Sequence, residues 1–302
     1  MKLMFITDTH FSSQAPLRRK DKWPDVCLEK LQATVDSAKK HKIDYILSGG
    51  DWFKALVPEP PYWLAREVKM ILNSGPPVIS ILGQHDVYGH NPDTFSRGVL
   101  GLLESSNFRI LEDIMFLEDG TVLKGFSHRD SLLSEIVHPD AFKDCDIALV
   151  HAMVVPYPVA WDHVVYDQIV PHQAIICCGD YHPGFLKSPI LNPGSFMRLS
   201  IESIPRVPYL LRLDTVSESV CTFWIQTVPT AKHSEDVFDM DRYEKDKDSL
   251  DKAEVLSNFI NQMKGVVSLN TEYNLSALID SLATRFVVPQ DIVRMAKEMC
   301  KL

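Results

Sequence analysis

The sequence predicts an α/β fold of layered strands and helices, followed by a smaller, mainly helical C-terminal region. Through the first two-thirds of the chain, short apolar runs alternate with stretches in which apolar residues recur at helical spacing. Beyond residue 230 the composition shifts to a stretch rich in Asp, Glu and Lys, and helical periodicity follows it. This succession is typical of an α/β layered domain with an appended helical region.

Strand and helix signals alternate along the first part of the chain. The apolar run at residues 3–6 predicts a strand, and the apolar positions between Leu28 and Ala38 predict a helix over residues 24–40. The same reasoning predicts a helix at residues 62–73 and strands at 45–47, 78–82, 121–126, 147–150 and 174–178. Residues 209–213 and 220–225 are expected to form an antiparallel pair.

A domain boundary is expected near residue 230. It separates residues 1–230 from a small helical cap or partner-binding region at residues 231–302. Helical stretches in the second region are expected at residues 250–263, 275–286 and 289–301. About 70 residues rarely hold a large core alone, so this region is expected to pack on the first domain or on a partner.

The composition is that of a globular protein without a membrane anchor. About 45% of the residues are hydrophobic and 24% are charged. No apolar run approaches the ~20 residues that a membrane-spanning helix needs, and the N-terminal segment turns polar too soon for a signal peptide. A cytoplasmic location without membrane attachment is therefore expected. None of the six cysteines forms a Cys-x-x-Cys pair, so a cysteine zinc site is not expected.

The net charge limits the kind of nucleic-acid binding that the chain supports. A formal charge of -9 argues against a surface built for broad, salt-dependent binding of nucleic acids. It leaves a nucleic-acid substrate open, because bound divalent cations reverse the sign of the local field.

Five apolar runs share one layout, in which each run ends directly in side chains that bind metal ions. In chain order they end in Asp8-Thr9-His10, Gly49-Gly50-Asp51, Gly83-Gln84-His85-Asp86, Val150-His151 and Gly179-Asp180-Tyr181-His182. Open α/β sheets place their ligand sites beyond the carboxyl ends of the strands, so we expect these side chains to converge. In Asp8-x-His10 and Asp180-x-His182, an extended backbone would point both ligands to the same side.

The donor types indicate which cations such a site binds. Mixed carboxylate and imidazole donors favour Mn, Fe or Zn over an all-oxygen magnesium cage. A carboxylate between two cations bridges them and holds them ~3.5–4 Å apart. The motifs therefore predict a metal-dependent phosphoesterase with a two-metal site.

Taken in order, the five motifs resemble those of the calcineurin-like metallophosphoesterases, which are Asp-x-His, Gly-Asp, Gly-Asn-His-Asp, a strand-end His and Gly-His-x-His. The segment Asn192-Pro193-Gly194-Ser195, followed by Arg198-Leu199-Ser200, resembles the SbcD-type subunit of the double-strand-break repair nuclease. The resemblance covers residues 1–230. It implies a β-sandwich flanked by helices.

The resemblance implies a first metal site that is complete. Asp8, His10 and His182 match the ligands of one metal ion, and Asp51 matches the bridging carboxylate. These four residues stand where the family has the same residue types.

The second metal site departs from the family pattern. Gln84, His151 and Asp180 fall at its ligand positions, but the family has Asn in place of Gln84 and His in place of Asp180. These changes make the site richer in oxygen, which favours Mn or Mg, or they weaken it so that one metal alone is tightly bound. His85 matches a non-ligand histidine that contacts the scissile phosphate, stabilising charge or protonating the leaving oxygen. Lys54, where the family often has His, either contacts substrate phosphate or is simply exposed.

The resemblance implies a metal-dependent DNA exo- and endonuclease that uses a hydroxide activated by two divalent ions, Mn first and Mg as the alternative. It also implies an ABC-type coiled-coil ATPase as partner in DNA end processing, repair or recombination, and a homodimer. Residues 275–302 are expected to supply helices that dock the partner, or to close the chain's own small helical domain.

Two other functions are compatible with the sequence. One is a phosphatase or small-molecule phosphodiesterase of the same superfamily, because metal ligands do not define the substrate. The other is a non-catalytic scaffold subunit with a degenerate metal site, for which Gln84 and Asp180 are the only support.

Several residues near the motifs have structural interpretations. Trp52 is expected to pack beneath the site rather than stack on a base, and Tyr181 to point away from the metals. Ser195 is expected to serve the turn at Pro193. His128 is expected on the surface, or alternatively in contact with DNA.

Overall fold

The computed structural model describes residues 1–54, 60–89, 91–216, 220–227, 237–245, 293–294 and 297. The chain divides into two compact units, Met1–Phe238 and Asp239–Leu302. The helices predicted at residues 250–263, 275–286 and 289–301 lie almost entirely outside the described residues. The boundary at residue 230 and the helical cap therefore stay predictions.

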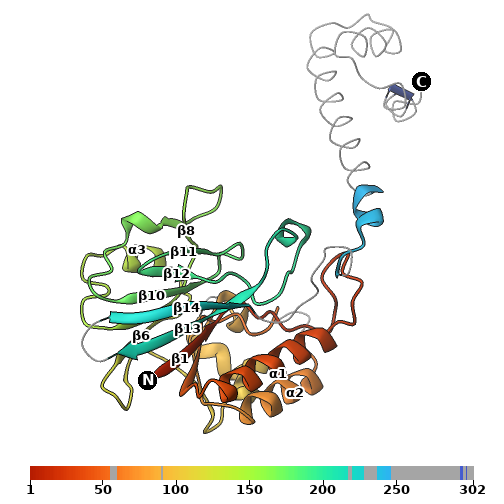
Figure 1. Ribbon diagram of the computed structural model, residues 1–302. Coiled ribbons are helices and arrows are strands. Elements are labelled where there is room, and N and C mark those ends of the chain that lie inside the picture. The colour runs from red at the N-terminus through yellow and green to blue at the C-terminus, as the bar shows by residue number, and fades with distance from the viewer. Residues whose placement is uncertain are drawn as a thin grey trace, which may run out of the picture. The chain divides into compact units, whose positions relative to one another are not determined.

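The first unit is built on two six-stranded sheets, and Figure 1 shows one of them over the other. The first sheet has the strand order β14-β13-β1-β2-β3-β4. Its strands are β1 Lys2–Ile6, β2 Tyr45–Ser48, β3 Val78–Ser80, β4 Phe108–Ile110, β13 Tyr209–Val216 and β14 Val220–Thr227. Strands β1 to β4 run parallel, and β13 and β14 form an antiparallel pair that joins β1 in antiparallel register.

The second sheet has the strand order β11-β12-β10-β7-β6-β5. Its strands are β5 Ile114–Phe116, β6 Val122–Phe126, β7 Ile147–His151, β10 Ile175–Gly179, β11 Phe185–Lys187 and β12 Ile190–Asn192. The four central strands run parallel, and the edge strands β5 and β11 run antiparallel to their neighbours. A short parallel pair, β8 Val154–Val155 and β9 Val164–Val165, follows β7.

Alternation along the central strands decides which side chains lie between the sheets. Leu3 and Phe5 of β1 share one buried core with Leu149 of β7 and Cys177 of β10, which belong to the other sheet. Met4, between them, faces the opposite way into a core shared with helices. Because both faces of these parallel strands are covered, they read in the sequence as continuous apolar runs.

Helices cover the outer faces of the two sheets, with α1 and α2 on one side and α3 on the other (Figure 1). Helix α1 spans Asp25–Lys40 and α2 spans Tyr62–Asn73, and their residues Leu31 and Val68 are fully buried in the core on the first sheet. Helix α3 spans Leu132–Ile136 and packs in the outer core of the second sheet. Short 3₁₀ helices occur at Gln84–Asp86, Pro92–Arg97, Val99–Leu103, Tyr166–Gln168 and Ile201–Ser203.

The predicted fold class is confirmed, and so are its longer elements. The helix predicted over residues 24–40 is α1, that over residues 62–73 is α2, and β13 and β14 are the predicted antiparallel pair. The sequence did not predict β4, β5, β11, β12 or α3, which have three to five residues each and are too short to show a periodicity. Among the described residues, no helix is long and apolar enough to cross a bilayer.

Candidate metal centre

The predicted site residues lie where parallel strands of both sheets end. Asp8 and His10 follow β1, Asp51 follows β2, Gln84 and His85 follow β3, His151 ends β7, and Asp180 and His182 follow β10. Strands β1, β2 and β3 are neighbours in one sheet, and β7 and β10 are neighbours in the other. The two sheets meet directly at the site, because the backbone N–H of Asp180 donates to both carboxylate oxygens of Asp8, each at 3.1 Å.

The backbone turns at these strand ends instead of staying extended. Asp8, His10, Asp51 and Asp180 have φ values of 52°, 47°, 55° and 75°. The expected extended backbone through Asp8-x-His10 is therefore wrong, and tertiary hydrogen bonds bring the ligands together. The N–H of Asp8 donates to the carbonyl of Gly50 at 3.1 Å, and that of His10 to the carbonyl of Asp51 at 3.0 Å. Left-handed backbone at non-glycine residues is unfavourable, and such residues gather at functional sites whose surroundings hold them.

The first group of donors consists of Asp8, His10 and His182, whose ligand atoms lie within 4.8 Å of one another. The Nε2 atoms of the two histidines are 2.9 Å apart, and each lies 3.6–3.8 Å from Oδ1 of Asp8. Ligands bound at ~2.1 Å around one cation are separated by roughly 3–4 Å, so this spacing fits a metal ion. Burial lowers the pKa of His10 to about 3, which keeps its imidazole neutral and its lone pair available.

Asp51 lies at the centre of the site and is fully buried. Its Oδ1 accepts the backbone N–H of His85 at 2.9 Å, but its Oδ2 has no hydrogen-bond partner among the described residues. Instead, Oδ2 lies 3.7 Å from Nε2 of His10 and 3.5 Å from Nε2 of His151. Burial alone would raise the pKa of Asp51, but the neighbouring histidines together, with His151 contributing most, hold the pKa below its usual value. A buried, ionised oxygen between two histidines is the place where cations compensate the lost hydration.

His151 presents its Nε2 atom to the second predicted site. Its Nδ1 lies 2.5 Å from the carbonyl oxygen of Gly49 and donates a proton to it, an arrangement that orients ligand histidines. Its Nε2 lies 2.7 Å from Oε1 of Gln84. Burial alone would lower the pKa of His151, but the carboxylates around it together, with Asp51 contributing most, raise it well above its usual value. A cation that binds at Nε2 displaces the proton held there.

Asp180 stands apart from these donors, whereas His85 forms a further close donor group with His10 and Asp51. The carboxylate of Asp180 belongs to none of the close donor groups among the described residues, and its Oδ1 accepts the side-chain N–H of Gln84 at 2.9 Å. The side chain of His85 is 40% exposed, and its Nε2 lies 3.9 Å from Oδ2 of Asp51. His85 therefore stands on the open side of the site, where a substrate can reach it.

Asp86 supports the site from below, a role that the sequence analysis did not assign. Its buried carboxylate accepts the backbone N–H groups of Asp51 at 2.8 Å, Trp52 at 3.1 Å and Gly83 at 2.9 Å. Its position at the end of the Gly-Gln-His-Asp motif was the signal that could have revealed it. Trp52 is fully buried, and its indole N–H donates to Oγ of Ser80 at 2.8 Å, so it packs beneath the site as expected.

Other residues near the motifs also have structural roles. Tyr181 packs in the outer core of the second sheet, away from the metal ligands on either side of it. The hydroxyl of Ser195 donates to the carbonyl of Met197 at 2.7 Å within the turn. His128 is half-buried, not on the open surface, and its ring centroid lies 6.3 Å from that of His151.

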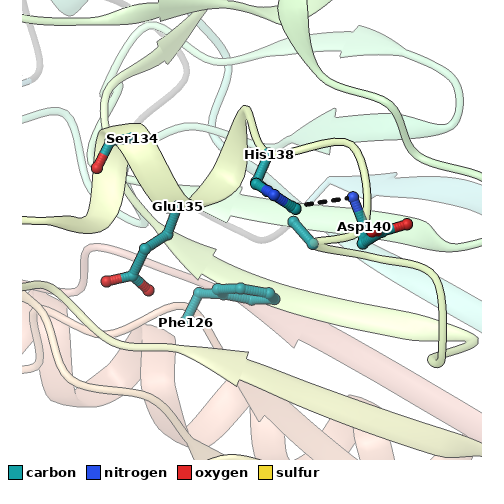
Figure 2. Close-up of a pocket in the computed structure, with 6 residues that line it drawn as sticks. Phe126, Ser134, Glu135, His138 and Asp140 are labelled. Carbon is teal, nitrogen blue, oxygen red and sulfur yellow. Dashed lines mark hydrogen bonds between the residues drawn. The ribbon is translucent and has the colours of Figure 1, made fainter.

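A separate pocket lies on the outer face of the second sheet, beside α3 (Figure 2). It is lined by Phe126, Ser134, Glu135, His138, Asp140 and Ala141. The backbone N–H of Asp140 donates to Nδ1 of His138 at 3.2 Å, and Glu135 is paired with Arg129. Because none of the predicted metal ligands lines this pocket, it is not part of the metal centre.

A comparison with family models identifies the kind of protein. Residues 1–184, more than half of the chain, match the model described as calcineurin-like phosphoesterase. The chain belongs to this family. The matched residues include every predicted metal ligand, and calcineurin-like phosphoesterases use two divalent metal ions, for which the close donor groups around Asp51 are suited.

Several solved structures resemble this chain. One is an archaeal phosphodiesterase with 13% sequence identity and a TM-score of 0.39, and the alignment covers 75% of this chain and 100% of the phosphodiesterase. A dimetal phosphatase from Danio rerio has 10% identity over 76% of this chain and 96% of its own, with a TM-score of 0.47. The calcineurin-like phosphoesterase YfkN from Bacillus subtilis has 13% identity over 76% and 92%, with a TM-score of 0.43. At these TM-scores the three structures add nothing to the assignment. A search of curated proteins gave no match.

Proposed function

We propose that this calcineurin-like phosphoesterase is a DNA nuclease of SbcD type that hydrolyses phosphodiesters. The observation that carries the catalytic part is the buried Oδ2 of Asp51, which lacks a hydrogen-bond partner among the described residues and is surrounded by histidine Nε2 atoms. Divalent cations bound there supply a hydroxide nucleophile near neutral pH and neutralise the phosphoryl oxygens. With mixed oxygen and nitrogen donors, we propose Mn as the metal in use.

The chain's own residues divide the remaining work. Asp8, His10 and His182 hold one cation, and Asp51 faces both sites. His85 is the residue placed to stabilise charge on the phosphate or to protonate the leaving oxygen, because its ring is the partly exposed one beside Asp51. Its backbone N–H donates to Oδ1 of Asp51, which holds the backbone of His85 beside the metal site.

A loop with exposed aromatic side chains supports a nucleic acid as the substrate. Residues 156–163 connect β8 to β9, and in this loop Tyr157 is 60% and Trp161 is 72% exposed. The loop is anchored to the outer core of the second sheet, because the hydroxyl of Tyr181 donates to that of Tyr157 at 3.4 Å. Exposed aromatic side chains bind single-stranded bases by stacking, at ~1–3 kcal/mol per base. A small phosphomonoester without bases could not stack on these exposed rings.

The net charge of -9 favours a second candidate, a phosphodiesterase that acts on small molecules. Lys54, three residues after Asp51, is exposed, and exposure is compatible both with a contact to substrate phosphate and with a purely solvated side chain. A scaffold role has less support, because the donor groups around Asp51 are intact.

We also propose that the protein works as a homodimer with an ABC-type coiled-coil ATPase in cytoplasmic DNA end processing, repair or recombination. Exposed Tyr62, Trp63 and Met70 on α2 give a second copy an apolar surface to cover. Residues 275–302, the proposed ATPase-docking segment, lie almost entirely outside the described residues. Co-purification of the ATPase with a chain lacking residues 270–302 tests this, and undiminished binding would contradict it.

Cleavage assays with two substrates test the proposed activity. In separate reactions, the chain is incubated with Mn²⁺ and either linear double-stranded DNA or bis-p-nitrophenyl phosphate. We expect DNA cleavage that Asp51→Ala and His85→Ala each reduce by at least about 100-fold, because the first removes a metal donor and the second removes the phosphate contact. Efficient hydrolysis of the small diester without cleavage of DNA would support the second candidate instead, and full nuclease activity in either variant would reject the assigned roles.

A further inference from the structure

Gln84 and Asp180 come from different sheets and meet at the second metal site. They are 96 positions apart in the chain, and Nε2 of Gln84 donates to Oδ1 of Asp180 at 2.9 Å. The other end of the same amide, Oε1, lies 2.7 Å from Nε2 of His151. The amide of Gln84 therefore stands between a carboxylate on one side and the metal-facing histidine on the other.

The side chain of Asp180 is directed at this amide and not at the metal donors. Its carboxylate is absent from the close donor groups found among the described residues, whereas Asp8, Asp51 and His151 form one such group. The backbone of Asp180 is fixed at a φ of 75°, with its N–H held by Asp8 at 3.1 Å. This backbone conformation determines the direction in which the side chain leaves the backbone, and the carboxylate then reaches the amide of Gln84.

The chemistry of an amide makes this contact consequential. Only the oxygen end of a carboxamide binds a cation, and the two ends have nearly the same shape. An ionised carboxylate accepts hydrogen bonds but donates none, so Asp180 pairs with the NH₂ end and turns Oε1 of Gln84 towards the site.

We propose that Asp180 is a positioning residue that acts on the second cation through Gln84, and that Asp51, His151 and Gln84 are the protein donors to this cation. The inference rests on the two-cation site of the proposed function. Under this inference, the two departures from the family pattern form one coupled change. The longer amide of Gln84 reaches the cation, and the carboxylate of Asp180, in place of an imidazole, orients that amide. With three protein donors, the second cation keeps open positions for water and substrate oxygens and binds more weakly than the first.

Titration of Mn²⁺ into the full-length chain by calorimetry, with metal analysis, tests the proposal. Asn tolerates the left-handed backbone and still offers an acceptor oxygen, so we expect Asp180→Asn to bind the second Mn²⁺ within about threefold of wild type. Asp180→Gly removes the acceptor without straining this φ, and we expect the second Mn²⁺ to bind about 10–100-fold more weakly while the first is unchanged. His151→Ala, which removes a direct donor, is the matched control and should abolish the second binding event. Equal losses in Asp180→Asn and His151→Ala would show that the carboxylate binds the metal directly.

The coupling is tested by a double substitution, read from the electron paramagnetic resonance signal of a spin-coupled Mn²⁺ pair. Gln84→Asn alone should lose this signal, because the shorter amide reaches neither partner. Adding Asp180→His recreates the family's donor set and should restore the pair, whereas additive losses would reject the coupled change. A wild-type chain that binds one Mn²⁺ only would also overturn the inference. A chain that binds two Mn²⁺ and cleaves no DNA would reject the proposed nuclease while leaving this inference intact.

Discussion

Removing the carboxylate of Asp86 tests how the metal site is supported. This side chain accepts backbone N–H groups from Asp51, Trp52 and Gly83 at 2.8–3.1 Å. Asp86→Ala leaves three buried donors without their acceptor, and each such donor costs roughly 1–3 kcal/mol. Water entering the vacated space recovers part of this. We therefore expect the free energy of unfolding to fall by about 3–6 kcal/mol, the lower half of the summed cost.

Urea denaturation followed by circular dichroism measures this loss at fixed pH, with and without Mn²⁺. Asp86→Asn keeps one acceptor oxygen and should lose about 1–2 kcal/mol. The control is Asp36→Ala on α1, an exposed residue whose partner Lys39 lies at 3.2 Å, and it should change stability by less than about 0.5 kcal/mol. A loss below about 1 kcal/mol for Asp86→Ala would mean that the three N–H groups find other acceptors, and the reasoning would be refuted.

Three further outcomes are expected. Trp161→Ala should raise KM for DNA by about fivefold or more, because stacking is lost, and should leave hydrolysis of bis-p-nitrophenyl phosphate unchanged. Trp161→Phe should keep most of the affinity for DNA. Equal effects on both substrates would contradict the stacking role. Gly83→Ala should abolish Mn²⁺ binding in metal analysis, because the added Cβ would lie 2.0 Å from Oδ1 of Asp51; two bound ions in this variant would contradict the geometry. Because the raised pKa of His151 leaves it protonated at neutral pH without metal, affinity for the second Mn²⁺ should fall as the pH is lowered from about 8 to about 6, by up to about tenfold per unit. Calorimetry in buffers of different ionisation enthalpy should show one proton released, and release of none would contradict this.

The parts of the fold that the sequence predicted are those whose signal is local. Helix α1 was predicted at residues 24–40 and spans Asp25–Lys40, because four turns of periodic apolar residues define it. Strands β11 and β12 have three residues each and were missed, since they exist through their pairing with each other and with β10. Their formation depends on the tertiary structure, which a local pattern does not contain.

The candidate site was predictable in its composition but not in its geometry. The order of motifs was enough to place Asp8, Asp51 and His151 at one edge, because parallel strands end there together. The turn of the backbone into the left-handed region at Asp8 and Asp180 was not predictable, because hydrogen bonds from distant strand ends impose it. The direction of the Asp180 carboxylate depends on that turn, so the position in the motif alone could not predict its hydrogen bond with Gln84.

The two sheets of the sandwich approach each other closely beside the candidate metal centre. A Cβ on Gly179 of the second sheet would lie 2.4 Å from Oγ1 of Thr7 and 3.0 Å from the carbonyl oxygen of Gly49, both in the first sheet, so only glycine fits there. The same approach lets Gly49 accept the proton of His151, which carries a metal donor from the second sheet to Asp51 of the first. A side chain at Gly179 would push the two sheets apart, whereas one at Gly49 would meet Thr7 and Phe5 on its own side of the sandwich. Gly179 therefore matters to the candidate site as much as its donors do, because the close approach that it permits sets the distance between donors of the two sheets.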